Sequence, residues 1–204
     1  KVPCERSTVG SNSGSAEGDG HVNEIDKLST QLLEEAKRFF EIAAMKNGDM
    51  AAQDAYLHAA LLLGFSSLEA HVNAIAEELV MRTGLGVLDK SILVERDFKL
   101  KNGQFQLTEQ LKIYRLEDRL LFIFANFPPA GCQQPTNDLW WSKLKDGMIL
   151  RNQLVHPKAS VKVDLTAVST SLTAIIECLN ALYGVVFSRP FPPRNRGLNS
   201  TLTF

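Results

Sequence analysis

The stretch DLTAVSTSLTAIIECLNALYGVV, residues 164–186, decides the fold class, because its apolar side chains recur every three or four residues. This period places them on one stripe of an α-helix that Asp164 can cap. The stripe consists of Leu165, Val168, Leu172, Ile175, Leu179, Leu182 and Val186. A stripe this narrow packs against one partner helix, within a bundle or across a dimer.

The same period recurs in four segments upstream. It predicts a helix that stops at Asn47-Gly48, a second over about 49–82, a third that Thr108 caps, and a fourth over 136–155. Pro157 ends the fourth, because the residue before a proline avoids the α region. We therefore expect an all-α bundle of about five helices.

Residues 85–107 interrupt the helical pattern. Two short β runs flank the turn pair Asn102-Gly103, which favours a hairpin or an irregular insertion. The helical domain is expected to span 21–188. A Gly- and Ser-rich flexible segment, 1–20, precedes it, and a proline-rich tail or extended arm, 189–204, follows it.

The composition is that of a globular protein, with 45% hydrophobic and 22% charged residues and a net charge of -1. No global basic field recruits nucleic acid, so RNA binding requires a local patch. Cys4, Cys132 and Cys178 form no disulfide framework, which favours a reducing, cytoplasmic setting. No apolar run approaches the roughly 20 residues of a membrane span, so no membrane contact is expected. No metal-ligand spacing or nucleotide-binding motif occurs, and we expect neither a metal nor a cofactor.

Arg151 is the first anomaly, because it lies within an apolar arc of the predicted fourth helix. That arc contains Trp140, Trp141, Leu144, Met148 and Val155. The two tryptophans are interpreted as packing anchors rather than base-stacking groups. An arginine there is costly unless it is paired or lines a polar pocket. Two interpretations stay open: Arg151 points into a cleft and stabilises an anion, or its stem packs while its head pairs with a carboxylate.

His156 stands at the end of the same helix, whose partial negative charge favours the imidazolium that a general acid requires. Asn152, four residues earlier, can reach the same face. The plain alternative is a surface histidine that caps the helix.

Glu69 is a second anomaly, because it lies on an apolar arc of the predicted second helix with Asn73 four residues later. A carboxylate there needs a cation, and Arg151 is the natural candidate. The pair would either orient Arg151 or serve as a structural salt bridge.

Positive charge gathers near Arg151: the segment 139–162 has a net charge of +4, from five basic residues and one acidic residue. The basic residues are Lys143, Lys145, Arg151, Lys158 and Lys162, and the acidic residue is Asp146. This charge would attract a phosphodiester, although a merely solvated basic face is also common.

The run RNQLVHPK, residues 151–158, resembles the signature of HEPN domains, in which an Arg and a polar residue precede a His by four to six positions. The helical context and the Glu69–Asn73 pair are also similar to that family, over about residues 21–188. The resemblance implies a HEPN-like bundle and a metal-independent endoribonuclease that forms a 2′,3′-cyclic phosphate.

The resemblance also implies roles and partners. Arg151 would stabilise phosphate charge, His156 would transfer a proton or align the 2′-hydroxyl, and Asn152 would position both. RNA contacts are expected from Lys143, Lys145 and Lys158, and a homodimer would share one active-site groove.

A toxin–antitoxin or defence setting, with an antitoxin or regulatory partner, fits this family. Lys158 replaces a tyrosine that serves as a modification site in one subgroup, so that form of control is not expected. The alternative is a non-catalytic HEPN-like dimer that binds a nucleotide or a protein.

Overall fold

The computed structural model describes residues 18–46, 48–128 and 135–204, with side chains from residue 27 onward within those ranges. Helix begins at Gly18, so residues 18–20 do not belong to the flexible segment expected over 1–20. The first 17 residues, with Cys4, lie outside the described residues, and so do Cys132 and the side chain of His21.

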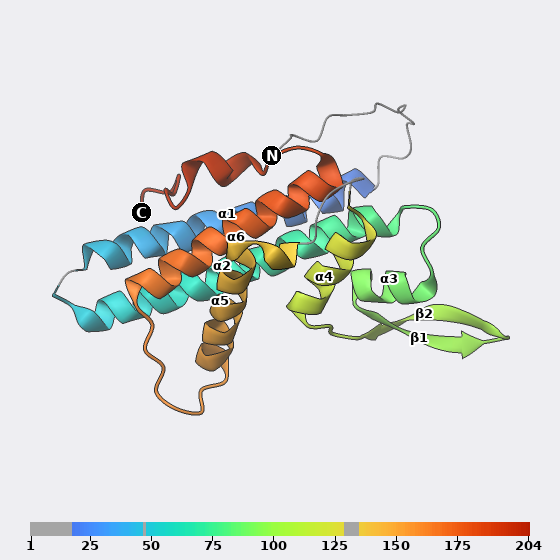
Figure 1. Cartoon of the computed structure of the whole chain (residues 1–204), viewed down its shortest axis with the longest axis horizontal. Coiled ribbons are helices and arrows are strands. Elements are labelled where there is room, and N and C mark those ends of the chain that lie inside the picture. The colour runs from blue at the N-terminus through green and yellow to red at the C-terminus, as the bar shows by residue number, and fades with distance from the viewer. Residues whose placement is uncertain (1–17, 47, 129–134) are drawn as a thin grey trace.

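Three long helices form the body of the molecule: α1 (Gly18–Met45), α2 (Met50–Val80) and α6 (Leu165–Phe187). They lie side by side along its long axis (Figure 1). The predicted stripe of α6 supplies Leu172 and Leu179 to the core, where both are fully buried. A Cβ added at Gly64 would lie 2.5 Å from Cδ2 of Leu172, so glycine allows α2 to approach α6 closely.

The fourth and fifth helices of the prediction are confirmed as α5 (Leu139–Val155) and α6. The α5 helix ends two residues before Pro157, and the Asp164 side chain caps α6 by accepting a hydrogen bond from the Ala167 amide at 2.8 Å. Trp141 and Leu144, near the start of α5, are buried in the core. The last turns of α5 and the loop after it project away from the three long helices (Figure 1).

The hairpin is also confirmed, but its surroundings differ from the prediction. It consists of β1 (Arg96–Lys101) and β2 (Gln104–Leu111), joined through Asn102 and Gly103 at φ 51° and 76°. Thr108 was expected to cap a helix, and this is wrong: it lies inside β2, and α4 (Leu116–Asn126) begins eight residues later. Polar and apolar side chains alternate over residues 104–107, as is typical of a strand, and these residues pair with β1.

A short helix, α3 (Val87–Val94), precedes the hairpin and was not predicted, so the chain has six α-helices over the described residues. Two short 3₁₀ helices, η1 (Pro135–Asn137) and η2 (Pro192–Arg196), complete the structure.

The C-terminal segment, 189–204, packs against α1 and is not a free tail. Its anchor is Glu34, a buried carboxylate that accepts hydrogen bonds from the Thr201 amide at 2.7 Å and from Arg196 at 2.7 Å. Lys37, fully buried beside it, lies 3.2 Å from Glu34. Phe191 is buried as well, so the segment belongs to the folded domain.

Burial affects the pKa values of the two charged residues of this anchor, Glu34 and Lys37. Burial by itself raises the pKa of Glu34, but hydrogen bonds from Thr201 and the charge of Lys37 outweigh it and hold that pKa below its usual value. Burial lowers the pKa of Lys37, and Glu34 opposes that shift only in part. The segment is therefore attached through a carboxylate that needs its charge.

The helices α2 and α6 are long and apolar enough to cross a membrane by length and composition, which corrects the expectation that no segment is. Polar residues, including carboxylates such as Glu177 in α6, interrupt both apolar stretches, so neither contains an unbroken apolar run of membrane-spanning length. In this fold 61% of the α2 window and 50% of the α6 window are buried inside the bundle. Core helices of a bundle have this same composition.

Candidate functional site

Arg151 and Glu69 form the ion pair that their anomalous positions predicted. Nη2 of Arg151, on α5, lies 2.7 Å from Oε1 of Glu69, on α2. The two side chains remain 29% and 39% exposed, so the pair lies at the surface of the bundle and not beneath it. The guanidinium is thus oriented by a carboxylate and still open to solvent, where an anion can approach it.

Asn152 connects Arg151 to a neighbouring cavity. Nη1 of Arg151 donates a hydrogen bond to Oδ1 of Asn152 at 3.2 Å. Asn152 also lines an open cavity of about 770 Å³ together with His156. The asparagine therefore stands between the two groups that the sequence assigned to chemistry.

The cavity is formed by the last turns of α5 and the loop before α6. Its lining includes Ile149, Asn152, Gln153, His156, Lys158 and Lys162. His156 is the C-cap residue of α5 and is exposed, and its backbone amide donates to the Asn152 carbonyl at 2.9 Å.

Arg151 is not among the residues that line this cavity, because its head turns toward α2. One chain therefore brings Asn152 and His156 together on one side and Arg151 with Glu69 on the other. The two halves of the predicted site are adjacent and linked through Asn152, but they do not face one another within a single chain.

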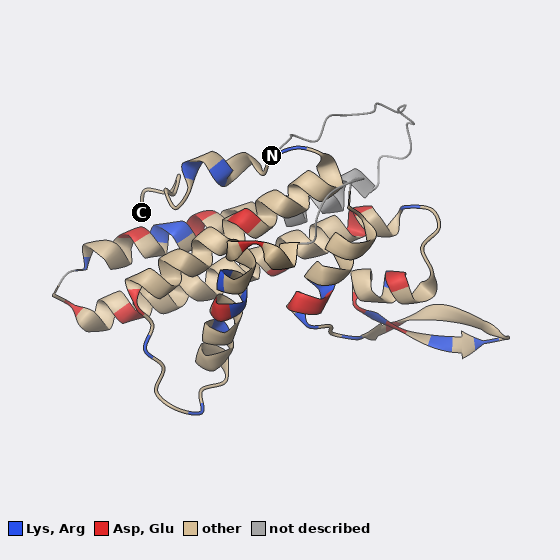
Figure 2. Cartoon of the chain, in the orientation of Figure 1, with Lys and Arg blue, Asp and Glu red and all other residues tan. Residues whose placement is uncertain are grey.

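The three predicted RNA-contacting lysines divide in a similar way. Lys158 lines the cavity with His156. Lys145 is exposed and lies seven residues before Asn152, which places both on one face of α5. Lys143 lines a separate cavity of about 310 Å³ with Asp146 and Asp164, so the fold does not bring it to the site. Figure 2 shows Lys and Arg along α5 and the loop that follows it.

Asn73, expected to support the site beside Glu69, contacts a different arginine. Nη1 of Arg119, on α4, donates a hydrogen bond to Oδ1 of Asn73 at 2.8 Å. The same nitrogen lies 2.9 Å from Oε2 of Glu95, and Nη2 donates to the Leu93 carbonyl at 2.8 Å. Asn73 thus links α2 to α4 through Arg119, and the same arginine contacts the base of the hairpin.

Arg119 is the residue near the site that sequence reasoning missed. It is 4% exposed, and burial lowers its pKa while the charges of Glu95 and Glu69 oppose that shift. Glu69 therefore lies in the field of two guanidiniums, Arg151 and Arg119. The missed signal is the spacing of Arg119 from Leu116 and Ile123, which places Arg119 on an apolar stripe of its helix. Arg151 lies on an apolar stripe of its own helix in the same way.

No group of three His, Cys, Asp or Glu side chains that could hold a metal occurs within the part of the chain that the structure describes. Cys178 is buried, and burial raises the pKa of its thiol, which keeps it protonated and unreactive. His71 is buried and packs against the rings of Tyr183 and Phe191.

Comparison with known proteins finds no matching family model, no similar curated protein and no similar solved structure.

Proposed function

We propose that this protein is a HEPN-like, metal-independent endoribonuclease that acts as a cytoplasmic homodimer in a toxin–antitoxin or defence setting. The single observation that carries the proposal is the continuous polar contact from Glu69 through Arg151 to Asn152, which lies beside His156 at an open cavity. An oriented cation, an amide and an imidazole are the groups that RNA cleavage without a metal requires.

In the proposed reaction the 2′-hydroxyl of RNA attacks the adjacent phosphorus and gives its proton to a base. The phosphorus–5′-oxygen bond breaks, and the leaving oxygen takes a proton from an acid. Arg151 stabilises the extra negative charge of the phosphorane, with Glu69 fixing the direction of its guanidinium. His156 transfers a proton, and the Asn152 amide holds the phosphate between them.

A second copy of the chain completes this chemistry. Cleavage uses both a base and an acid, while one chain places one histidine at this cavity. A two-fold axis beside α5 would bring two copies of Arg151 and His156 to one groove. Exposed apolar side chains on this part of α5, Ile149 at 58% and Val155 at 46%, support an interface there.

A second candidate is a non-catalytic dimer that binds a nucleotide or a protein partner. The observation that favours it is the direction of Arg151, whose head contacts Glu69 and does not line the cavity of His156. The cavity alone, with Asn152, His156 and Lys158, could hold a phosphate without cleaving it.

Cleavage of labelled single-stranded RNA in a chelator distinguishes the two candidates. We expect the wild type to cut, and Arg151→Ala or His156→Ala to reduce the rate by about 100-fold or more while the dimer persists. Lys143→Ala is the matched control, because Lys143 is a basic residue of the same helix that lines a different cavity. Wild-type protein that binds nucleotide but leaves RNA intact would support the second candidate. Undiminished cleavage by the Arg151 and His156 variants would reveal a contaminating nuclease.

A further inference from the structure

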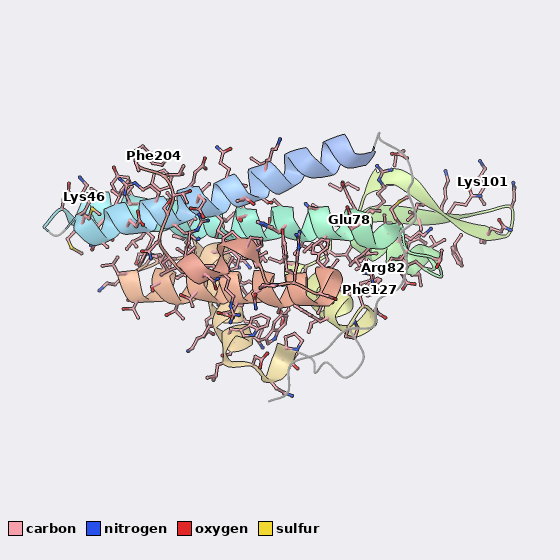
Figure 3. The ribbon with its side chains drawn as sticks, turned by 90° about the horizontal axis from the view of Figure 1, so that it is seen from above. Lys46, Glu78, Arg82, Lys101, Phe127 and Phe204 are labelled. Atoms are coloured by element: carbon pink, nitrogen blue, oxygen red, sulfur yellow. The ribbon has the colours of Figure 1, made fainter. Side chains whose placement is uncertain are left out.

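The hairpin extends beyond the helix that covers its base. Helix α3 packs against both strands, and the inner side chains Phe98 and Leu107 are half-buried. Farther out, Leu100 is 64% exposed and Phe105 is 58% exposed. Lys101 lies at the outer end of the hairpin, away from the helical body (Figure 3).

The strand register gives the outer hairpin two unlike faces. Phe98 is paired with Leu107 and Leu100 with Phe105, so these four side chains share one face. The T-shaped contact of the Phe98 and Phe105 rings, with centroids 5.9 Å apart, confirms that arrangement. The opposite face has Lys99, Lys101, Gln104 and Gln106.

The outer part of the hairpin has a net positive charge and contains no acidic residue. Residues 98–107 include two lysines and no Asp or Glu, in a protein whose net charge is -1. Both lysines are exposed. Proteins that bind single-stranded nucleic acid combine aromatic stacking surfaces with positive charge. The outer hairpin has the exposed Phe105 ring on one face and two ammonium groups on the other, with no carboxylate to compete.

We propose that the hairpin is a contact arm for single-stranded RNA, with a base stacked on Phe105, Leu100 in apolar contact beside it, and phosphates held by Lys99 and Lys101 of the opposite face. This inference rests on the proposed function, since the bound strand is the substrate of the Arg151 site. Charge complementarity selects RNA as the occupant, because the polar face offers ammonium and amide donors to phosphate oxygens. A protein that covered only the apolar face would leave these donors without a role.

The distance from the Arg151 site makes the arm specific for long strands. Glu69 lies eleven residues before the end of α2, which is about 16 Å of helix at about 1.5 Å per residue. The six residues of β1 add about 20 Å at about 3.3 Å per residue. A dinucleotide at Arg151 therefore does not reach the tip, whereas a strand of about 20 nucleotides does.

The test measures binding of a 2′-O-methyl strand of about 20 nucleotides, which lacks the attacking hydroxyl, by fluorescence anisotropy. We expect Phe105→Ala to weaken binding by about 5- to 100-fold, and Lys101→Ala to reduce the slope of log affinity against log salt by about 0.7. Lys46→Ala and Ile113→Ala are the matched controls. Lys46 is an exposed lysine at the opposite end of the molecule (Figure 3), and Ile113 is a 78% exposed apolar residue near the hairpin base.

Kinetics on cleavable RNA separate this inference from the proposed function. Phe105→Ala should raise KM for the long strand, leave kcat unchanged, and leave cleavage of a dinucleotide unaffected. If Phe105→Ala, Lys101→Ala and the wild type show equal binding and equal KM, the hairpin does not contact RNA. That result would leave the proposed nuclease activity unaffected. Hairpin-dependent binding without cleavage by the wild type would retain the arm and reject the nuclease.

Two further outcomes would overturn the arm. One is wild-type protein that fails to bind the strand. The other is loss of binding to anionic phospholipid vesicles in Phe105→Ala with unchanged RNA binding, which would assign the tip to a membrane surface. Each variant should keep the wild-type melting temperature, because the altered side chains are exposed.

Discussion

Replacing Glu69 by glutamine separates an orienting role from a structural one. The substitution keeps the size of the side chain and removes the charge that Arg151 contacts at 2.7 Å. Glutamine can still accept one hydrogen bond from the guanidinium, but it no longer fixes its direction electrostatically. The free energy of unfolding should therefore change little, whereas the cleavage rate should fall.

The exposure of the pair sets the expected size of both effects. An ion pair whose partners are 29% and 39% exposed contributes about 0–1 kcal/mol to the free energy of unfolding. In a chain of this length that corresponds to a fall in melting temperature of at most about 4 °C. A guanidinium displaced by about 1 Å from the phosphate would lower the cleavage rate by about 10- to 100-fold.

Calorimetry and single-turnover cleavage of labelled RNA measure the two quantities on the same protein. Glu177→Gln is the matched control: Glu177, on α6, lies 3.2 Å from Arg194 in an ion pair whose side chains are 34% and 44% exposed, outside both the site and the hairpin. We expect the control to leave both quantities unchanged. Unaltered cleavage by Glu69→Gln would refute the orienting role. A fall in the melting temperature of Glu69→Gln by more than about 8 °C would identify the pair as a structural salt bridge.

Three other substitutions test the packing of the fold, and the first also predicts a pH dependence. Glu34→Gln should lower the free energy of unfolding at pH 7 by about 3–5 kcal/mol, because it leaves Lys37 buried without its carboxylate; chemical denaturation measures this, and a loss below about 1 kcal/mol would contradict it. Because folding lowers the pKa of Glu34, its contribution is complete above pH 4.5 and is lost as the pH falls through the lower folded pKa, so wild-type and variant melting temperatures should converge in acid. Arg119→Met should cost about 3–5 kcal/mol in the same measurement, since Glu95 loses its buried partner; a neutral result would show that Arg119 does not hold the hairpin base. Gly147→Ala should cost about 1–3 kcal/mol, because the added Cβ would lie 2.7 Å from Oγ of a serine on α6, and an unchanged melting curve would mean that the helices separate freely.

The parts of the fold that could be predicted are those governed by neighbours in sequence. Asp164 caps α6 through an amide three residues away, and Pro157 limits α5 by its own ring. Asn102-Gly103 likewise forms its turn from local backbone preferences. The extent of the hairpin was mispredicted because Thr108 fits both a helix cap and a strand, and only pairing with β1 decides between them.

Contacts between distant segments could be predicted only where both partners were anomalous. Glu69 and Arg151 each lie on an apolar arc, and each needed an opposite charge, so their pairing followed. Asn73 had no such requirement, and its choice of Arg119 depends on where α4 packs against α2. The attachment of Thr201 to Glu34, 167 residues apart, had no local signal at all.

The ends of the cleaved RNA test the central claim most directly, because attack by the neighbouring 2′-hydroxyl leaves one particular product. Mass spectrometry of fragments formed in a chelator should show 2′,3′-cyclic phosphates with the wild type, and the Arg151→Ala variant should form these fragments about 100-fold more slowly or not at all. Fragments that end in a 3′-hydroxyl, or cyclic phosphates formed equally by Arg151→Ala, would contradict the proposal that Arg151 and His156 cut RNA.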